Sequence, residues 1–495
     1  MIEKYYSGVI EQIYNRIGKE TRNIVMANYS NDFSIENLEV IRRYQSNEDN
    51  VFFAYSEFSY NTLVGAYEPF LDIICNMHRR FIGGSFDDFQ RECGVYYLHR
   101  QVLNSYYETG ECFREETVLL NEVAYEQRRM TKAIVDMLKR LSEVRPLMIV
   151  INRFQMASKS SIETIKYLID NPCTNIGIVL GVNVQVKGTD STVEVWDRIV
   201  ESLEDRSAIY YIGSAGQQNN HIRDTSDDEL YITTNFEQSI QEASNIMEFL
   251  DYEQAKRGCR IIEHKIKFED AWIDEKSLRR FYFIYARTSV LLGEMSKAIE
   301  LTNEYKALIP ENDSEHYFSL YYFMKGTCYM YQGKLEKAEG CAKKAYDYAL
   351  LADDELLEFK SELLSVMIKM SGWYNIFFCV QDIPVSDEFI EKIIKHGYRN
   401  HLAHIYIYAY DNSRDVVKQS FYDESLLKHF TKGLELAKKI GNEQLVYDAY
   451  QKLLGPDAKE LLEQAGCDDA AYPWSDAPVE TIEAIVEVVQ LPDEP

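Results

Sequence analysis

The chain has 495 residues, of which 80 are acidic and 53 basic, so its formal net charge at pH 7 is −27. Such an acidic surface repels phosphate backbones and anionic lipid, which excludes nucleic acid and membrane as expected partners. The length allows two or three domains, and a hydrophobic content of 46% predicts that most of the chain folds.

The cysteines and the first residues bear on the cellular compartment. Nine cysteines are scattered along the chain with no C-x-x-C pair, which indicates reduced and mostly buried thiols. The N-terminal sequence lacks the apolar core of a signal peptide, and no apolar run reaches 18 residues. We therefore expect a cytoplasmic protein, either alone or as a homo- or hetero-oligomer.

Residues 1–215 alternate between two kinds of segment. An amphipathic helix is predicted over 1–20, and helical periodicity recurs between short runs that are apolar throughout. Unbroken apolar runs are typical of strands that are buried on both faces of a parallel sheet. The alternation predicts an α/β domain with strands at 23–27, 50–55, 146–151, 176–182 and 208–213.

The remaining sequence is mainly helical in character. Residues 216–277 begin with a polar, glycine-bearing linker and continue into a segment that we expect to form a small helical or winged-helix-like lid. Helical repeats are expected over 278–465. Residues 466–495 form an acidic tail with eight acidic and no basic residues.

The repeats are predicted from a pattern of small residues. Gly326, Tyr329, Gly333, Ala338 and Ala345 stand at offsets 0, 3, 7, 12 and 19, which predicts two helices joined by a tight turn at Gly333. This skeleton resembles the tetratricopeptide repeat, an element that binds proteins and peptides. An ordinary helical bundle with a chance glycine is the alternative interpretation.

A neighbouring segment carries the same skeleton. Ala286, Gly293 and Ala298 take the corresponding offsets, and Gly293 precedes Gly333 by 40 residues. Because a single helical pair cannot bury its apolar face alone, adjacent pairs are expected to stack into an α-helical solenoid.

In the α/β part, an apolar strand at 146–151 is followed by Phe154, Gln155, Met156 and Ala157, and then by Ser158 and Ser160-Ser161 at the start of a helix. This order resembles the STAND-type ATPases, which include the large LuxR-type bacterial regulators. The segment 145–170 keeps the frame of the family's second acidic motif, in which an apolar strand ends in two acidic residues and a serine-capped helix follows. Here the two acidic positions are Asn152 and Arg153. An unrelated doubly wound domain and an active ATPase are the alternatives.

The phosphate loop of the family would lie directly after the first strand. Against the pattern G-x-x-x-x-G-K-[ST], residues 27–34 keep only the final Ser34: Ala27 and Asp32 replace the glycines, and Phe33 replaces the lysine. Asp32 would repel a phosphate, and Asn152 lacks the carboxylate that holds the magnesium shell. The resemblance therefore implies a degenerate P-loop domain, a pseudo-ATPase without a nucleotide cofactor.

These features predict a non-enzymatic scaffold, adaptor or regulatory subunit that binds a protein or peptide through its repeats. Tyr285, Tyr322 and Tyr329 are the expected partner contacts. No metal site is expected, since the histidines of 396–404 lack cysteines or carboxylates at matching spacing. Two alternatives remain, a nucleotide-binding switch that does not hydrolyse its ligand and an assembly factor for a partner enzyme. No DNA-binding output domain is apparent.

Overall fold

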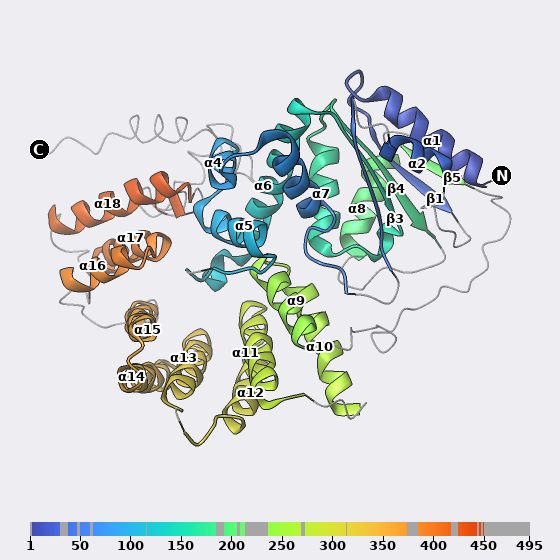
Figure 1. The fold of residues 1–495 in the computed structure, drawn as a ribbon. Helices are drawn as coiled ribbons and strands as arrows, with labels where there is room; N and C mark the ends of the chain where they lie inside the picture. Colours follow the sequence, from blue (N-terminus) through green and yellow to red (C-terminus); the bar gives the residue numbers. More distant parts are fainter. Residues whose placement is uncertain are drawn as a thin grey trace, which may run out of the picture. The chain divides into compact units, whose positions relative to one another are not determined.

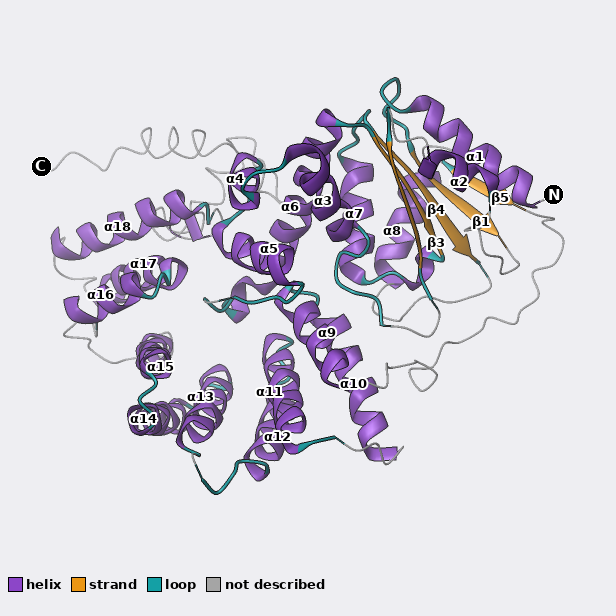
Figure 2. Ribbon diagram, in the orientation of Figure 1, coloured by secondary structure: helices purple, strands orange, loops and turns teal. Residues whose placement is uncertain are grey.

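The computed structural model describes most of the chain: residues 2–29, 38–46, 50–59, 63–114, 116–184, 193–204, 208–212, 236–268, 273–312, 314–373, 385–416, 424–442, 445–446 and 449. These residues belong to two compact units, Met1–Leu308 and Ile309–Pro495, which we describe separately. The first unit contains a sheet and helices, and the described part of the second is helical (Figures 1 and 2).

All five apolar runs that were predicted as strands are strands, and they pair in parallel. The order in the sheet is β2-β3-β4-β1-β5, with bounds β1 Ile24–Tyr29, β2 Phe52–Glu57, β3 Leu147–Asn152, β4 Ile176–Asn183 and β5 Ile209–Ile212. Every residue of β3 and β4 is buried, as expected for central strands covered on both faces. The predicted α/β fold class of this region is confirmed.

Helix α1 (Ile2–Arg16) packs closely against β4 because that strand carries glycine at two positions on one face. A Cβ atom at Gly177 would lie 2.9 Å from the Ile17 side chain, and one at Gly181 would lie 2.4 Å from the Tyr6 hydroxyl. Helix α2 (Glu39–Ser46) follows β1, while α7 (Lys159–Asp170) and α8 (Val193–Glu204) cover the opposite face of the sheet from α1 (Figure 1).

The connection from β2 to β3 is long and helical. It contains α3 (Phe70–Met77), a π-helical turn (His78–Ile82), α4 (Phe86–Glu92), α5 (Tyr97–Thr109), a 3₁₀ turn (Leu120–Glu122) and α6 (Val123–Val144). Four further helices complete the first unit, namely α9 (Phe236–Glu248), α10 (Tyr252–Phe268), α11 (Glu275–Leu291) and α12 (Met295–Ala307). The first predicted repeat, α11 and α12, thus belongs to the same compact unit as the sheet.

The second unit contains α13 (Glu315–Tyr331), α14 (Leu335–Leu351), α15 (Glu355–Trp373), α16 (Asp387–Lys395), α17 (Arg399–Val416) and α18 (Glu424–Ile440). Helices α11, α13 and α15 begin 40 residues apart, which matches the predicted spacing. The turn after α13 is made at Gly333, whose φ of 69° is the left-handed conformation that glycine adopts easily. A helical C-terminal region is therefore confirmed, and its assignment to tetratricopeptide repeats stays a prediction.

Helices α13 and α14 approach closely along a line of alanines. Ala338, Ala342, Ala345 and Ala349 are all buried, and they recur at the three- and four-residue spacing of one helical face. Opposite them, a Cβ atom at Gly326 would lie 3.4 Å from the Ala338 carbonyl oxygen. Ala338 and Gly326 therefore lie where the two helices of the pair approach closely.

Candidate functional site

The carboxyl ends of parallel strands meet at one edge of a sheet, where open α/β domains bind their ligands. In this protein, β1 to β4 end at Tyr29, Glu57, Asn152 and Asn183, and we call this region the carboxyl edge. The ATPase resemblance places its phosphate loop directly after β1 and its acidic motif at the end of β3, so both belong to this edge.

The end of β3 is occupied by a buried hydrogen bond. The Tyr29 hydroxyl donates to Asn152 Oδ1 over 2.7 Å, and both residues are at most 1% exposed. Since β4 lies between β1 and β3, this bond passes over β4 at Gly181, where a Cβ atom would lie 2.6 Å from Asn152 Oδ1. Protein atoms thus fill the position at which a magnesium-binding carboxylate would stand.

A second tyrosine reaches the same place from α1. The Tyr6 hydroxyl lies above Gly181, beside the Tyr29–Asn152 bond. Burial raises the pKa of Tyr6 well above its ordinary value, and the neighbouring Tyr29 and Glu57 raise it further. The hydroxyl therefore keeps its proton at neutral pH.

Arg153 has the left-handed φ of 55° and turns its side chain along the carboxyl edge. Its guanidinium forms an ion pair with Glu57 over 3.0 Å and donates to the Phe58 carbonyl oxygen over 3.4 Å. Gln155 Oε1 accepts the backbone N–H of Asn183 over 3.1 Å. Arg153 and Glu57 are thus paired with each other, whereas Gln155 Nε2 is buried without a hydrogen-bond partner among the described residues.

The positions of the degenerate phosphate loop are only partly described. Ala27 is buried in the middle of the sheet, where it pairs with Gly181 of β4 and Tyr210 of β5. Asp32, Phe33 and Ser34 lie outside the described residues. At the end of β3 an amide and an arginine stand where the ATPase resemblance would place carboxylates, and the carboxylate at the end of β2, Glu57, is paired with Arg153.

The three tyrosines expected to contact a partner fall into two environments. Tyr285 is 2% exposed and packs against Phe281, at 5.8 Å between ring centroids, so it offers little surface to a partner. Tyr322 and Tyr329 are half-buried on α13. They line a surface that we call the lysine–tyrosine strip, made of Tyr322, Lys325, Tyr329, Lys337, Lys344 and Tyr348.

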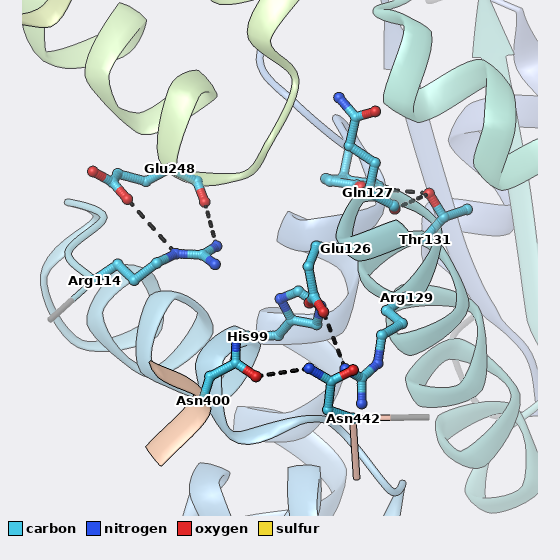
Figure 3. A network of polar contacts seen from close by, with 10 residues as sticks. His99, Arg114, Glu126, Gln127, Arg129, Thr131, Glu248, Asn400 and Asn442 are labelled. Atoms are coloured by element: carbon cyan, nitrogen blue, oxygen red, sulfur yellow. Dashed lines mark hydrogen bonds and ion pairs between the residues drawn. The ribbon is translucent and has the colours of Figure 1, made fainter. Parts of the chain in front are cut away.

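A buried charge network in the first unit was not predicted. His99 of α5 and Glu126 of α6 are almost fully buried, with His99 Nε2 3.0 Å from Glu126 Oε2, and Arg129 pairs with the same carboxylate over 3.1 Å (Figure 3). Burial lowers the pKa of His99 to about 4, although Glu126 opposes this shift. Burial also disfavours the Glu126 carboxylate, but Arg129 and His99 outweigh it and hold its pKa below the ordinary value.

A second set of polar contacts fastens α9 to the connection between β2 and β3. Arg114 donates to the Glu248 carbonyl oxygen over 2.8 Å, and the Glu248 carboxylate pairs with Arg287 of α11 over 3.1 Å (Figure 3 shows the Arg114 contact). Gln127 donates to the Leu250 carbonyl oxygen over 2.6 Å. These contacts link α9 and α11 to the connection between β2 and β3, within the unit that holds the sheet.

Neither group of contacts carries a sequence motif. His99 and Glu126 stand on different helices, and Glu248 lies more than a hundred residues from Arg114, so no local spacing reveals either pair. Within the described residues, no group of three or more His, Cys, Asp or Glu side chains is arranged to hold a metal ion.

Comparisons with known proteins leave the family open. No protein-family model matches the chain. No curated protein matches it. No solved structure matches it. None of the described helices combines the length and the apolar character that a membrane span requires.

Proposed function

We propose that this protein is a non-catalytic binding protein, in which a pseudo-ATPase domain supports helical pairs that capture a protein or peptide partner. The observation that carries the proposal is the buried Tyr29–Asn152 hydrogen bond at the carboxyl edge. A nucleotide with its magnesium ion needs carboxylate and phosphate-binding groups there, and a satisfied amide covered by two tyrosines supplies neither.

The geometry of the edge also supports the resemblance to STAND-type ATPases. Side chains from the ends of β1 and β3 meet across β4 in the contact between Tyr29 and Asn152, although 123 residues separate them. A phosphate loop after β1 and an acidic motif after β3 require this proximity. A domain that keeps the arrangement and replaces its ionic groups is best understood as a degenerate form.

Binding is assigned to the helical pairs because their surface offers half-buried aromatic rings beside cations. Tyr322 and Tyr329 each lie under a lysine side chain, so a partner could contact ring edges and ammonium groups together. Tyrosines in such positions contribute large contact areas at low conformational cost.

Retention of partners by immobilised protein tests this function. We expect a protein from a lysate of the source cells to be retained by the wild type and lost, by at least tenfold, in the Tyr322→Ala/Tyr329→Ala double variant. Tyr211→Ala is the matched control, since Tyr211 is an exposed tyrosine of the sheet unit, 71% accessible. A retained set that is unchanged in the double variant would contradict the assignment.

A further inference from the structure

The lysine–tyrosine strip runs along one side of the α13–α14 pair. Its members on α13 are separated by three and four residues, and those on α14 by seven and four, so each helix contributes a single face. The α13 members are half-buried, while Lys337 and Lys344 are exposed. The strip therefore presents half-buried tyrosine rings next to exposed lysine ammonium groups.

Ring and ammonium contacts hold this surface in place. Lys344 Nζ lies 5.2 Å from the centroid of the Tyr322 ring, and Lys337 Nζ lies 6.0 Å from that of Tyr329. The Tyr322 ring stacks on Tyr348 at 5.7 Å and 10° between planes. Pairs of this kind position a cation and leave its remaining N–H groups directed outward.

Cys341 lies between the cations. It stands four residues after Lys337 and three before Lys344 on α14, and burial raises the pKa of its thiol while Lys325 and Lys344 oppose that shift. None of the three strip lysines forms an ion pair with a carboxylate of the described residues. Of the acids of α14, Glu336 and Glu339 stand about 80° or more around the helix from either lysine, while Asp347 follows Lys344 by three residues and neighbours it on the helix surface.

A positive surface is unusual in a chain whose net charge is −27, and electrostatic complementarity favours an acidic occupant. We propose that the strip binds the acidic segment 466–495 of the same chain. That segment has eight carboxylates and no basic residue, and its Tyr472 and Trp474 could pack on the tyrosine rings of the strip. Its Glu480 and Glu487 are seven residues apart, the interval that separates Lys337 from Lys344.

The chain is long enough to reach the strip. The 26 residues between Ile440, where α18 ends, and residue 466 could span at most about 85 Å if fully extended. Helix α13 is about 25 Å long, so the acidic segment can reach any face of a unit of this size. The occupied strip includes Tyr322 and Tyr329, so the segment would compete with the partner. Only this regulatory consequence rests on the proposed function.

Zero-length carbodiimide crosslinking of the full chain, followed by peptide mass spectrometry of the monomer band, tests the contact. We expect Lys337 or Lys344 to be joined to carboxylates of residues 466–495, and Lys343, which is exposed on another side of α14, to be joined to them at least fivefold less. Crosslinks found only in a dimer band would assign the strip to a second copy, and strip lysines joined only to other carboxylates would assign it elsewhere. Either result overturns the proposal.

A second measurement uses Cys341 as a reporter and leaves α13 and α14 unaltered. In a variant whose eight acids of 466–495 are replaced by Asn and Gln, we expect alkylation of Cys341 to accelerate at least threefold. Adding the synthetic peptide 466–495 should restore the wild-type rate, and Lys343→Gln should not change it. An unchanged alkylation rate in the neutralised variant overturns the proposal, whereas partner retention that ignores the strip would overturn only the proposed function.

Discussion

Two regions of this protein place tyrosines beside polar groups, with opposite results. At the carboxyl edge, Tyr29 is buried and its hydroxyl is committed to Asn152. On the lysine–tyrosine strip, Tyr322 and Tyr329 are half-buried, and their rings support ammonium groups that remain exposed. The first arrangement stabilises a fold, and the second leaves interaction capacity for another molecule.

The difference lies in what surrounds each tyrosine. Gly181 has no side chain, so Tyr6 and Tyr29 can close over β4 and exclude water from Asn152. The tyrosine rings of α13 are instead covered by lysine side chains of α14, such as Lys344 over Tyr322. These long side chains leave the rings partly exposed to solvent. The carboxyl edge is therefore closed by core packing, while the strip keeps its rings and ammonium groups partly accessible.

The largest effect is expected from filling the gap above β4. In Gly181→Ala, the new Cβ would lie 2.4 Å from the Tyr6 hydroxyl and 2.6 Å from Asn152 Oδ1, so we expect a loss of about 2–3 kcal/mol in unfolding free energy. Urea titration measures it. Gly8→Ala in α1 is the matched control, since nothing lies within 4 Å of its Cβ, and it should gain about 0.5–1 kcal/mol. Equal stability of the two variants would show that the edge is not closed.

The packing of α13 against α14 can be tested in the same way, by placing a larger side chain at their contact. Ala338 is fully buried where α14 crosses α13, and Ala338→Leu should cost about 1–3 kcal/mol. Limited proteolysis should then cut faster within residues 314–373, with the sheet unit unchanged, because a repeat draws stability from its neighbours. Lys343→Leu introduces the same side chain at an exposed position of the same helix, and the protease should cleave it at the wild-type rate. Unchanged cleavage of Ala338→Leu would contradict the packing described.

The buried His99 sharpens the comparison, because it is a titratable group that burial keeps neutral. Its pKa is lowered from 6.5 to about 4, so its contribution to stability is present above pH 6.5 and is lost as the pH falls toward 4. Between pH 7.5 and pH 5.0 we expect the wild type to lose about 2 kcal/mol more than His99→Gln. Glu126, Arg129 and Arg114 face His99 and are common to both proteins. Parallel pH profiles would refute the neutral assignment.

A smaller effect is expected from removing one hydroxyl at the carboxyl edge. Tyr29→Phe deletes the donor to Asn152 Oδ1 and should cost about 1 kcal/mol. Tyr210→Phe is the control, because its hydroxyl donates to Gln12 at an exposed site and should cost about 0.5 kcal/mol or less. Thermal unfolding of both variants measures the difference, and no difference would mean that the buried bond is energetically neutral.

Much of the architecture could be predicted from the sequence. The five strands were predicted because their apolar runs are uninterrupted, and the turn after α13 because Gly333 permits the left-handed conformation. The helical pairs were predicted from alanines whose spacing lets two backbones approach. In each case the signal is local, within one strand or one helical pair.

The candidate site could be predicted only in part. On the ATPase resemblance, Asn152 and Arg153 stand where that family has acidic residues, but the partner of Asn152 is Tyr29, which only the parallel pairing of β1, β4 and β3 brings near. Tyr285 and Tyr322 both stand on the first helix of a predicted pair, yet the first is buried and the second half-buried. The outward or inward direction of a tyrosine on a helix depends on tertiary packing that spacing does not specify.

The central claim is that the carboxyl edge is closed to nucleotide, and one measurement tests it most directly. Hydrogen exchange of the full chain is followed with and without 1 mM ATP and magnesium, together with the thermal unfolding midpoint. We predict the same exchange at β1 and β3 and no change in midpoint. Binding with a dissociation constant of about 10 μM would add about 2.7 kcal/mol of stability at that concentration. Nucleotide-dependent protection at the ends of β1 and β3 would contradict the account.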